Sequence, residues 1–276
     1  MRRENLLLLA SALVGVGSAG LTAAKVRDIV RPEDDFDPSE CEGLTSNGGV
    51  LRGVRYLEQM RGDADPDEAV PMVVLFHSKG ATPEGHVNML RRSGPSRLIV
   101  PEGALSTRSG KGSLWWELGI KKAMEEDPMG AAAQWRAAAA RMHRFLQALV
   151  RCRPTVGKPI LTGSSMGGEM AYLMGTRYMD HAYASVSVNG YLIPELWSPH
   201  MVPTLALHGI DDRTVPYAWD KEYVEAMQAK GAPIRLESFD AGHGLTPEMG
   251  RAWGDAIKSL VASAAAGEPP RFSPTA

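Results

Sequence analysis

The chain has 276 residues, of which 44% are hydrophobic and 22% are charged, and its formal net charge is −2. This ordinary composition excludes collagen-like and disordered chains, and two cysteines are too few for a disulfide scaffold. The near-neutral charge and the lack of any run of five Lys or Arg residues argue against nucleic-acid binding, so we expect no nucleic-acid partner.

The N-terminal segment, residues 1–24, has the features of a secretory signal. Arg2 and Arg3 precede an apolar stretch, residues 6–16, and small residues follow as far as Ala24. A basic start, an apolar centre and a small-residue end are typical of a signal peptide, and the segment is also just long enough to span a bilayer. We therefore predict an exported protein, periplasmic or secreted, with membrane tethering through this segment or an ordinary N-terminal helix as alternatives.

The rest of the chain predicts one domain between a linker and a tail. Residues 25–48 are polar, acidic and interrupted by prolines, which is typical of a linker. Residues 49–266 alternate between strand-like and helix-like patterns, and length alone does not split them into two domains. The Pro-rich tail, residues 267–276, is expected to be loose.

Short segments of this domain, most of them apolar runs bounded by Gly or Pro, predict β-strands covered on both faces. They are residues 50–60, 71–76, 97–100, 159–162, 183–188, 203–207 and 234–239. Longer segments with helical spacing lie between most of them: residues 131–151, 169–178, 219–230 and 246–265. This alternation predicts an α/β fold with a mostly parallel central sheet and helices on both faces.

The strongest local motif is GSSMG at residues 163–167, which fits G-x-S-x-G with Ser165 at its centre. It follows a predicted strand and opens a predicted helix, the context that a nucleophile elbow requires. Such a tight turn needs small neighbours, and Gly163, Gly167 and Gly168 meet this need. At a helix N-terminus, free N–H groups also stabilise developing negative charge. We predict that Ser165 is a catalytic nucleophile; the alternative is an ordinary helix N-cap.

A serine hydroxyl needs a base that accepts its proton. His243 lies between glycines in residues 240–244, directly after the predicted strand 234–239, so a loop can carry its imidazole toward Ser165. An unrelated loop histidine is the alternative. The other histidines considered fit less well, because they lie in helical, connecting or Pro-flanked segments: His86, His143, His181 and His200.

The base in turn needs a carboxylate that orients it. Asp212 follows the predicted strand 203–207, and the chain order Ser165, Asp212, His243 is that of one known triad arrangement. Asp211 is the nearest rival, with a turn or N-cap role as its alternative, and Asp240 is a more distant one.

These motifs carry a family resemblance. From about residue 50 to residue 262, the chain resembles the α/β-hydrolase superfamily, and within it the phospholipase/carboxylesterase family, which includes acyl-protein thioesterase-like enzymes. The matching segments are LFHSKG at 75–80, GSSMGG at 163–168, LHGIDDRTVPY at 207–217 and AGHG at 241–244. The resemblance favours Asp212 over Asp211 as the acid and gives His77 and His208 structural positions.

The resemblance also implies an oxyanion hole, built from the N–H group of Met166 and one from the loop after the strand 71–76. That loop usually begins His-Gly, whereas here Ser78 follows the histidine, so Ser78 and Lys79 remain alternative donors. Loss of one donor typically costs about 100- to 1000-fold in rate. A solvated surface charge is the alternative role of the Lys79 side chain.

The substrate pocket is less defined by the sequence. Only residues 190–202 separate two predicted strands at the place where this fold usually inserts a lid, so we expect no large lid. Three tryptophans, Trp115, Trp116 and Trp197, are candidates for lining an acyl pocket, with core packing as the equal alternative. Cys41 and Cys152 could pair in an exported protein, or they are two ordinary thiols.

Together these features predict a serine hydrolase that cleaves carboxylic esters or thioesters, small-molecule acyl substrates, through an acyl-enzyme. No metal-ligand spacing is present, so we expect no metal and no cofactor. A peptidase or an acyltransferase on the same residues is the alternative within enzymes. A non-catalytic binding protein of the same fold is the alternative outside them.

Overall fold

The structure is a computed structural model that describes residues 36–117 and 119–272. The predicted signal segment, residues 1–24, lies outside the described residues. Among the residues that are described, no helix is long and apolar enough to cross a membrane.

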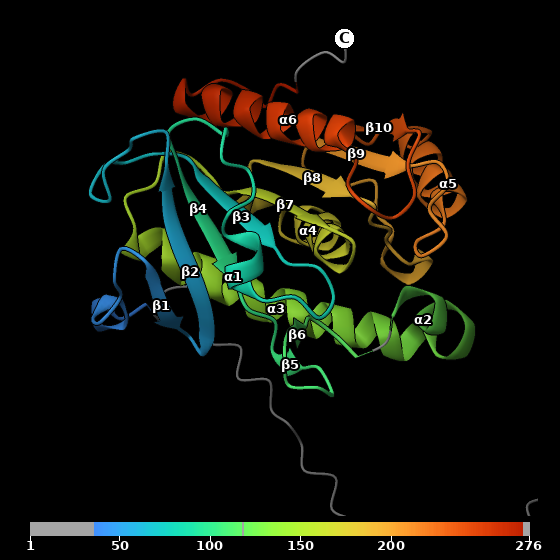
Figure 1. Ribbon diagram of the computed structural model, residues 1–276, viewed down its shortest axis with the longest axis horizontal. Helices are drawn as coiled ribbons and strands as arrows, with labels where there is room; N and C mark the ends of the chain where they lie inside the picture. The colour runs from blue at the N-terminus through green and yellow to red at the C-terminus, as the bar shows by residue number, and fades with distance from the viewer. Residues whose placement is uncertain (1–35, 118, 273–276) are drawn as a thin grey trace, which may run out of the picture. The chain divides into compact units, whose positions relative to one another are not determined.

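An eight-stranded sheet organises the domain, in the order β1-β2-β4-β3-β7-β8-β9-β10 (Figure 1). The strands are β1 (Gly48–Leu51), β2 (Val54–Arg61), β3 (Met72–Phe76), β4 (Ser96–Pro101), β7 (Ile160–Ser164), β8 (Ala184–Val188), β9 (Thr204–Gly209) and β10 (Ile234–Phe239). The pairs from β4 to β10 are parallel, whereas β1 with β2 and β2 with β4 are antiparallel. The predicted, mostly parallel sheet is confirmed.

One predicted strand, residues 50–60, is in fact two. Leu51 of β1 pairs directly with Val54 of β2, so a two-residue turn joins the strands. Both turn residues have positive φ, 48° at Arg52 and 72° at Gly53, as a tight hairpin of this kind requires. Because arginine rarely has a positive φ, the sequence did not predict a turn at Arg52.

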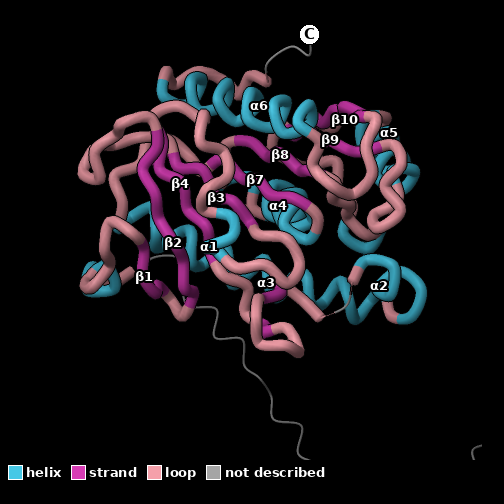
Figure 2. The backbone as a smooth tube through the Cα atoms, in the orientation of Figure 1, coloured by secondary structure: helices cyan, strands magenta, loops and turns pink. Residues whose placement is uncertain are grey.

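Helices cover both faces of the sheet, with α6 along one face and α3 and α4 along the other (Figures 1 and 2). The helices are α1 (Pro83–His86), α2 (Ile120–Glu126), α3 (Pro128–Cys152), α4 (Met166–Arg177), α5 (Tyr217–Gln228) and α6 (Pro247–Ala265). Shorter elements are the hairpin β5 (Leu105–Ser106) with β6 (Ser113–Leu114) and the 3-10 helices η1 (Pro38–Cys41), η2 (Met179–His181) and η3 (Pro194–Leu196). Only η3 lies between β8 and β9, where a large lid would be inserted.

The sheet has a hydrophobic core on each face, and β3 contributes to both. Met72, Val74 and Phe76 pack in the core that includes α3, α4 and α5, while Val73 and Leu75 pack in the core that includes α6. This alternation follows from the two-residue period of a strand, and burial on both faces explains why β3 is continuously apolar.

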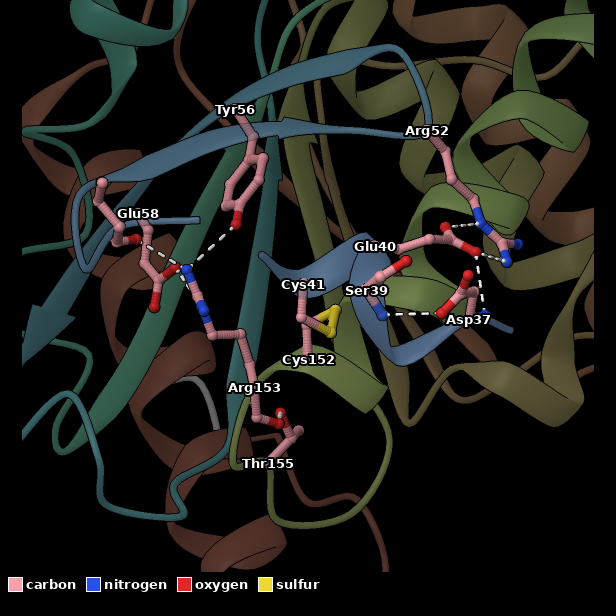
Figure 3. The surroundings of a disulfide bond; sticks show 11 residues. Asp37, Ser39, Glu40, Cys41, Arg52, Tyr56, Glu58, Cys152, Arg153 and Thr155 are labelled. Carbon is pink, nitrogen blue, oxygen red and sulfur yellow. Dashed lines mark hydrogen bonds and ion pairs between the residues drawn. A yellow bond between two sulfur atoms is a disulfide. The ribbon is translucent and has the colours of Figure 1, made fainter. Parts of the chain in front are cut away.

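A disulfide joins the N-terminal part of the domain to the end of α3. Cys41 of η1 and Cys152 of α3 are bonded, so the pairing that the sequence left open is present (Figure 3). Residues 36–48, which the sequence analysis placed in the linker, therefore lie against α3 and lead into β1. The adjacent Arg153 pairs at 2.7 Å with the buried carboxylate of Glu58.

Candidate active site

Ser165 stands at the sharp turn between β7 and α4. Its backbone has φ 55° and ψ −127°, a strained conformation for a residue with a side chain. The Ser165 N–H donates to the carbonyl of Val188 on the neighbouring strand at 2.8 Å, and this bond holds the turn against the sheet. The hydroxyl does not cap the helix, so the N-cap alternative does not account for the side chain.

Glycines beside Ser165 make this turn sterically feasible. A Cβ atom on Gly163 would overlap the backbone of Gly167 and Phe76, and one on Gly167 would overlap the backbone of Phe76 and His77. A Cβ atom on Gly168 would lie 2.8 Å from the Ser187 hydroxyl. The small residues that the sequence analysis required at these positions are therefore required by close backbone contact. Strain and crowding together indicate a functional turn.

The three residues singled out in the sequence form one chain of hydrogen bonds. The Ser165 Oγ lies 2.9 Å from Nε2 of His243, and Nδ1 of His243 lies 2.7 Å from Oδ2 of Asp212. Asp212 is buried and comes from the loop after β9, while His243 is half-buried and comes from the loop after β10. A Cβ atom on Gly209 would overlap the backbone of Ala241, so these two loops are in close contact.

Asp212 is further held by groups that the sequence analysis did not assign to it. Its Oδ1 accepts the N–H groups of Thr214 and Val215 at 2.8 and 3.0 Å. Its Oδ2 lies 3.4 Å from Nε2 of the buried His208. Burial by itself would raise the pKa of Asp212, but the hydrogen bonds from His208, His243 and Val215 outweigh it and lower the pKa to about 2. The carboxylate therefore remains ionised at neutral pH.

His208 connects Asp212 to a second buried carboxylate. Its Nδ1 lies 2.8 Å from Oδ2 of Asp220 on α5, and the other oxygen of Asp220 accepts the Tyr172 hydroxyl at 2.9 Å. Burial opposes protonation of His208, yet its bonds to Asp212 and Asp220 prevail and raise its pKa to about 9. His208 is thus a buried cation that orients Asp212, which agrees with its predicted structural position.

The loop after β3 reaches the nucleophile turn through Ser78. The Ser78 hydroxyl is within hydrogen-bond distance of two groups of Ser164. Its Oγ lies 2.8 Å from the Ser164 hydroxyl and 3.1 Å from the Ser164 carbonyl, to which it can donate. The Ser78 N–H donates to Nε2 of His86 at 3.3 Å. His77 is buried behind the loop, where its ring stacks on Trp115 at 4.6 Å, so its position is structural as predicted.

In the part of the chain that the structure describes, the backbone N–H groups of Met166 and Lys79 have no hydrogen-bond acceptor. Met166 begins α4, so its N–H has no acceptor within the helix. Among the described residues, the Lys79 N–H has no hydrogen-bond acceptor either, whereas that of Ser78 is engaged. Lys79, Met166 and Ser165 line the same cavity.

The tryptophans considered for an acyl pocket have packing roles. Trp115 and Trp116 are 4% and 1% exposed and belong to the core, where Trp116 stacks on Trp135 at 4.2 Å. Trp197 is half-buried, and its ring contacts Tyr223 at 5.4 Å. None of the three lines the cavity beside Ser165. Trp115 and Trp116 are core residues in this structure, and Trp197 packs against the same core.

The cavity beside Ser165 has a volume of about 340 Å³. It is lined by Lys79, Glu117, Gly119, Lys121, Lys122, Ser165, Met166, Glu169, Thr214 and Val215. Glu169 was not among the residues predicted from the sequence, although it lies four positions after Ser165, on the same face of a helix. Within the described part of the chain, no group of three or more His, Cys, Asp or Glu side chains could hold a metal ion.

The fold and this Ser–His–Asp geometry define an enzyme of the α/β-hydrolase class. The family model for phospholipase/carboxylesterase matches residues 63–260. The chain therefore belongs to the phospholipase/carboxylesterase family, as its motifs predicted.

Solved structures share the fold at low sequence identity. Esterase PE8 is 22% identical with a TM-score of 0.60, over 71% of this chain and 96% of that one. Acyl-protein thioesterase 2 from Zea mays is 21% identical with a TM-score of 0.58, over 76% and 99% of the two chains. A Bacillus cereus carboxylesterase is 14% identical with a TM-score of 0.60, over 74% and 94%. A search of curated proteins found no match.

Proposed function

We propose that this esterase-family enzyme hydrolyses carboxylic esters or thioesters through an acyl-enzyme formed on Ser165. The observation that carries the proposal is the continuous hydrogen-bonded chain from Ser165 through His243 to Asp212, which starts at a strained turn. A serine held in this way has a base within reach of its proton and a carboxylate that fixes the tautomer of that base.

The first half of the reaction forms the acyl-enzyme. With its Nδ1–H donated to Asp212, His243 accepts the Ser165 proton at Nε2 while the Ser165 Oγ bonds to the carbonyl carbon. The N–H groups of Met166 and Lys79 stabilise the oxyanion; Lys79 is the better second donor because the Ser78 N–H is bonded to His86. His243 then protonates the departing alcohol or thiol as the tetrahedral intermediate collapses.

The second half returns the free enzyme. Water attacks the acyl carbon while His243 accepts one of its protons, and the acid product leaves as Ser165 recovers its proton from His243. The proton transfers use Ser165, His243 and Asp212, which are already joined by hydrogen bonds.

Labelling with a fluorophosphonate probe tests the nucleophile, with wild type beside Ser165→Ala and Ser164→Ala as the matched control. We expect labelling of wild type and of Ser164→Ala but not of Ser165→Ala, together with turnover of 4-nitrophenyl esters of increasing acyl length. If the protein cleaves only peptide amides, it is a peptidase and not an esterase. If it transfers the acyl group to an alcohol instead of water, it is an acyltransferase. If folded wild-type protein shows neither labelling nor turnover, the protein is a non-catalytic binding protein of the same fold.

We also propose that the protein is exported by its N-terminal segment. The disulfide between Cys41 and Cys152 supports this proposal, since stable disulfides form in oxidising compartments. Cell fractionation with N-terminal sequencing of the mature protein tests it, and recovery of a reduced, uncleaved chain from the cytoplasm would refute it.

A further inference from the structure

Glu169 is a buried carboxyl group within the cavity of the nucleophile. It lies in the first turn of α4, is 3% exposed and lines the cavity together with Ser165. Among the described residues, its carboxyl has no hydrogen-bond or ion-pair partner. The carboxyl faces the cavity without a protein partner, so it is available to a polar group of a ligand bound there.

Lys79 places an unpaired ammonium on the same cavity. Its side chain is exposed, and no carboxylate in the described residues lies within ion-pair distance of it. Its Nζ reaches toward Gly119, where a Cβ atom would lie 3.4 Å from it. The ammonium therefore lies at the cavity that contains the nucleophile, and no side chain or carbonyl in the described part of the chain accepts a hydrogen bond from it.

The remaining charged groups of the cavity leave it positive. Lys121 and Lys122 also line it, with Lys121 donating to the Arg213 carbonyl and Lys122 paired with Glu126 at 3.4 Å. Glu117 is the exposed acidic residue of the lining. Burial raises the pKa of Glu169 to about 8 although the Lys79 charge opposes the rise, so this carboxyl is protonated and neutral at pH 7.

Resting on the proposed esterase activity, we propose that this cavity selects esters that carry a second, anionic group, such as a carboxylate or a phosphate, held between the Lys79 ammonium and the Glu169 carboxyl. The ammonium contributes charge, and the protonated carboxyl contributes an O–H donor. Hydrogen bonds with one charged partner are about twice as strong as neutral ones, so two of them discriminate effectively against an uncharged substrate.

The proposal predicts a specific pH dependence. As the pH rises through about 8, Glu169 loses its proton and repels the anion it had bound. The charged groups that line the same cavity are Lys79 from the loop after β3 and Glu117, Lys121 and Lys122, and the Lys79 charge acts on Glu169 directly. A neutral ester uses the same catalytic residues, but its binding does not depend on the charge of Glu169. The ratio of the two substrates therefore isolates Glu169.

Matched substrates test the inference. One pair places the charge on the acyl side: 4-nitrophenyl hydrogen adipate and its neutral methyl ester. A second pair places it on the alcohol side: 4-carboxyphenyl butyrate and its neutral methyl ester. At pH 7 we expect kcat/KM for the anionic member of one pair to exceed that of the neutral member by about tenfold, mainly through KM, and the responding pair identifies the side of the substrate that is recognised.

Variants assign the preference to its two residues. Lys79→Gln should reduce the anionic-to-neutral ratio to near one, while Lys158→Gln, an exposed lysine outside the cavity, should keep it. Glu169→Gln retains a neutral donor of the same shape, so this variant should keep the preference for the anionic ester at pH 7 and also at pH 9, where wild type loses that preference. Glu169→Leu has no donor, so this variant should show no preference at pH 7 or at pH 9.

The outcomes separate this inference from the proposed activity. A wild type that labels with fluorophosphonate and hydrolyses neutral esters, but shows equal kcat/KM for both members of both pairs, overturns the inference and leaves the esterase in place. The same holds if Lys79→Gln keeps the preference. A wild type that neither labels nor hydrolyses any of the four esters overturns both.

Discussion

At the scale of single residues, the function of Asp212 depends on the hydrogen bonds that surround it. Asp211 stands beside it in the sequence but is exposed, while Asp212 is buried and bonded to His243. The two neighbours thus form a natural comparison, since one carboxylate orients the base and the other points to solvent.

We expect Asp212→Asn to lower kcat for a 4-nitrophenyl ester by about 1,000- to 10,000-fold, because the amide no longer holds the His243 tautomer that accepts the Ser165 proton. Asp211→Asn is the control and should remain within about twofold of wild type, as surface substitutions usually have small effects. Equal loss in both variants would contradict the assignment. Steady-state kinetics at pH 7 measures the difference.

His208 should make the stability of the fold depend on pH. Its pKa is raised from 6.5 to about 9, so its ion pairs with Asp212 and Asp220 contribute fully below pH 6.5 and are lost as the pH rises through 9. We expect the melting temperature of wild type to fall more steeply than that of His208→Gln between pH 6.5 and 9. Glu169 ionises within the same window in both proteins, so the difference in slope reports His208. Parallel slopes in differential scanning fluorimetry would refute the assignment.

At the scale of elements, the nucleophile turn is determined by backbone packing more than by side chains. The carbonyl of Phe76 at the end of β3 contacts the turn so closely that Gly167 has no room for a Cβ atom. A helical glycine elsewhere in the domain is not crowded in this way. Gly254 in α6 faces open space, and a Cβ atom there would meet nothing within 4 Å.

Two glycine substitutions should therefore act in opposite directions. Gly167→Ala should lower the melting temperature and abolish esterase activity, since β3 and α4 must separate to admit the methyl group. Gly254→Ala should stabilise the fold by about 0.5 to 1 kcal/mol, because alanine is the better residue in a helix interior. Thermal unfolding of both variants measures this, and a stable, active Gly167→Ala would show that the turn is less crowded than the structure indicates.

At the scale of the whole molecule, the disulfide links residues 111 positions apart and constrains the unfolded chain. It joins η1 to α3, neither of which carries Ser165, Asp212 or His243. Its contribution should thus be to stability and not to the reaction.

We expect the double variant Cys41→Ser/Cys152→Ser to lose about 2 to 5 kcal/mol of unfolding free energy, as is typical when a native disulfide is removed. At 25 °C, its kcat/KM should match that of wild type as long as it is folded. Urea unfolding with and without reductant provides the measurement. In the reduced samples, wild type should approach the double variant, and an unchanged midpoint would show that the disulfide contributes little.

The sequence indicated much of the architecture because it follows from local rules. Short apolar runs alternate with amphipathic helices only when a parallel sheet is covered on both faces, and this pattern was confirmed by the observed sheet. The prediction of one strand over residues 50–60 was wrong, because the turn at Arg52 and Gly53 has no strong local signal. The prediction of a linker over residues 36–48 was also wrong, because these residues contact α3 and Cys152, which lie far along the chain.

By itself, the sequence determined the fold class, the family and the residues of the Ser165–His243–Asp212 chain, since glycine-flanked motifs after apolar strands have few other structural uses. Only the tertiary structure decided that Trp115 and Trp116 belong to the core, that Cys41 meets Cys152 and that Glu169 is buried in the cavity lined by Lys79 without a partner in the described part of the chain. Burial, pairing and pKa depend on neighbours from distant parts of the chain, and no local pattern records those neighbours.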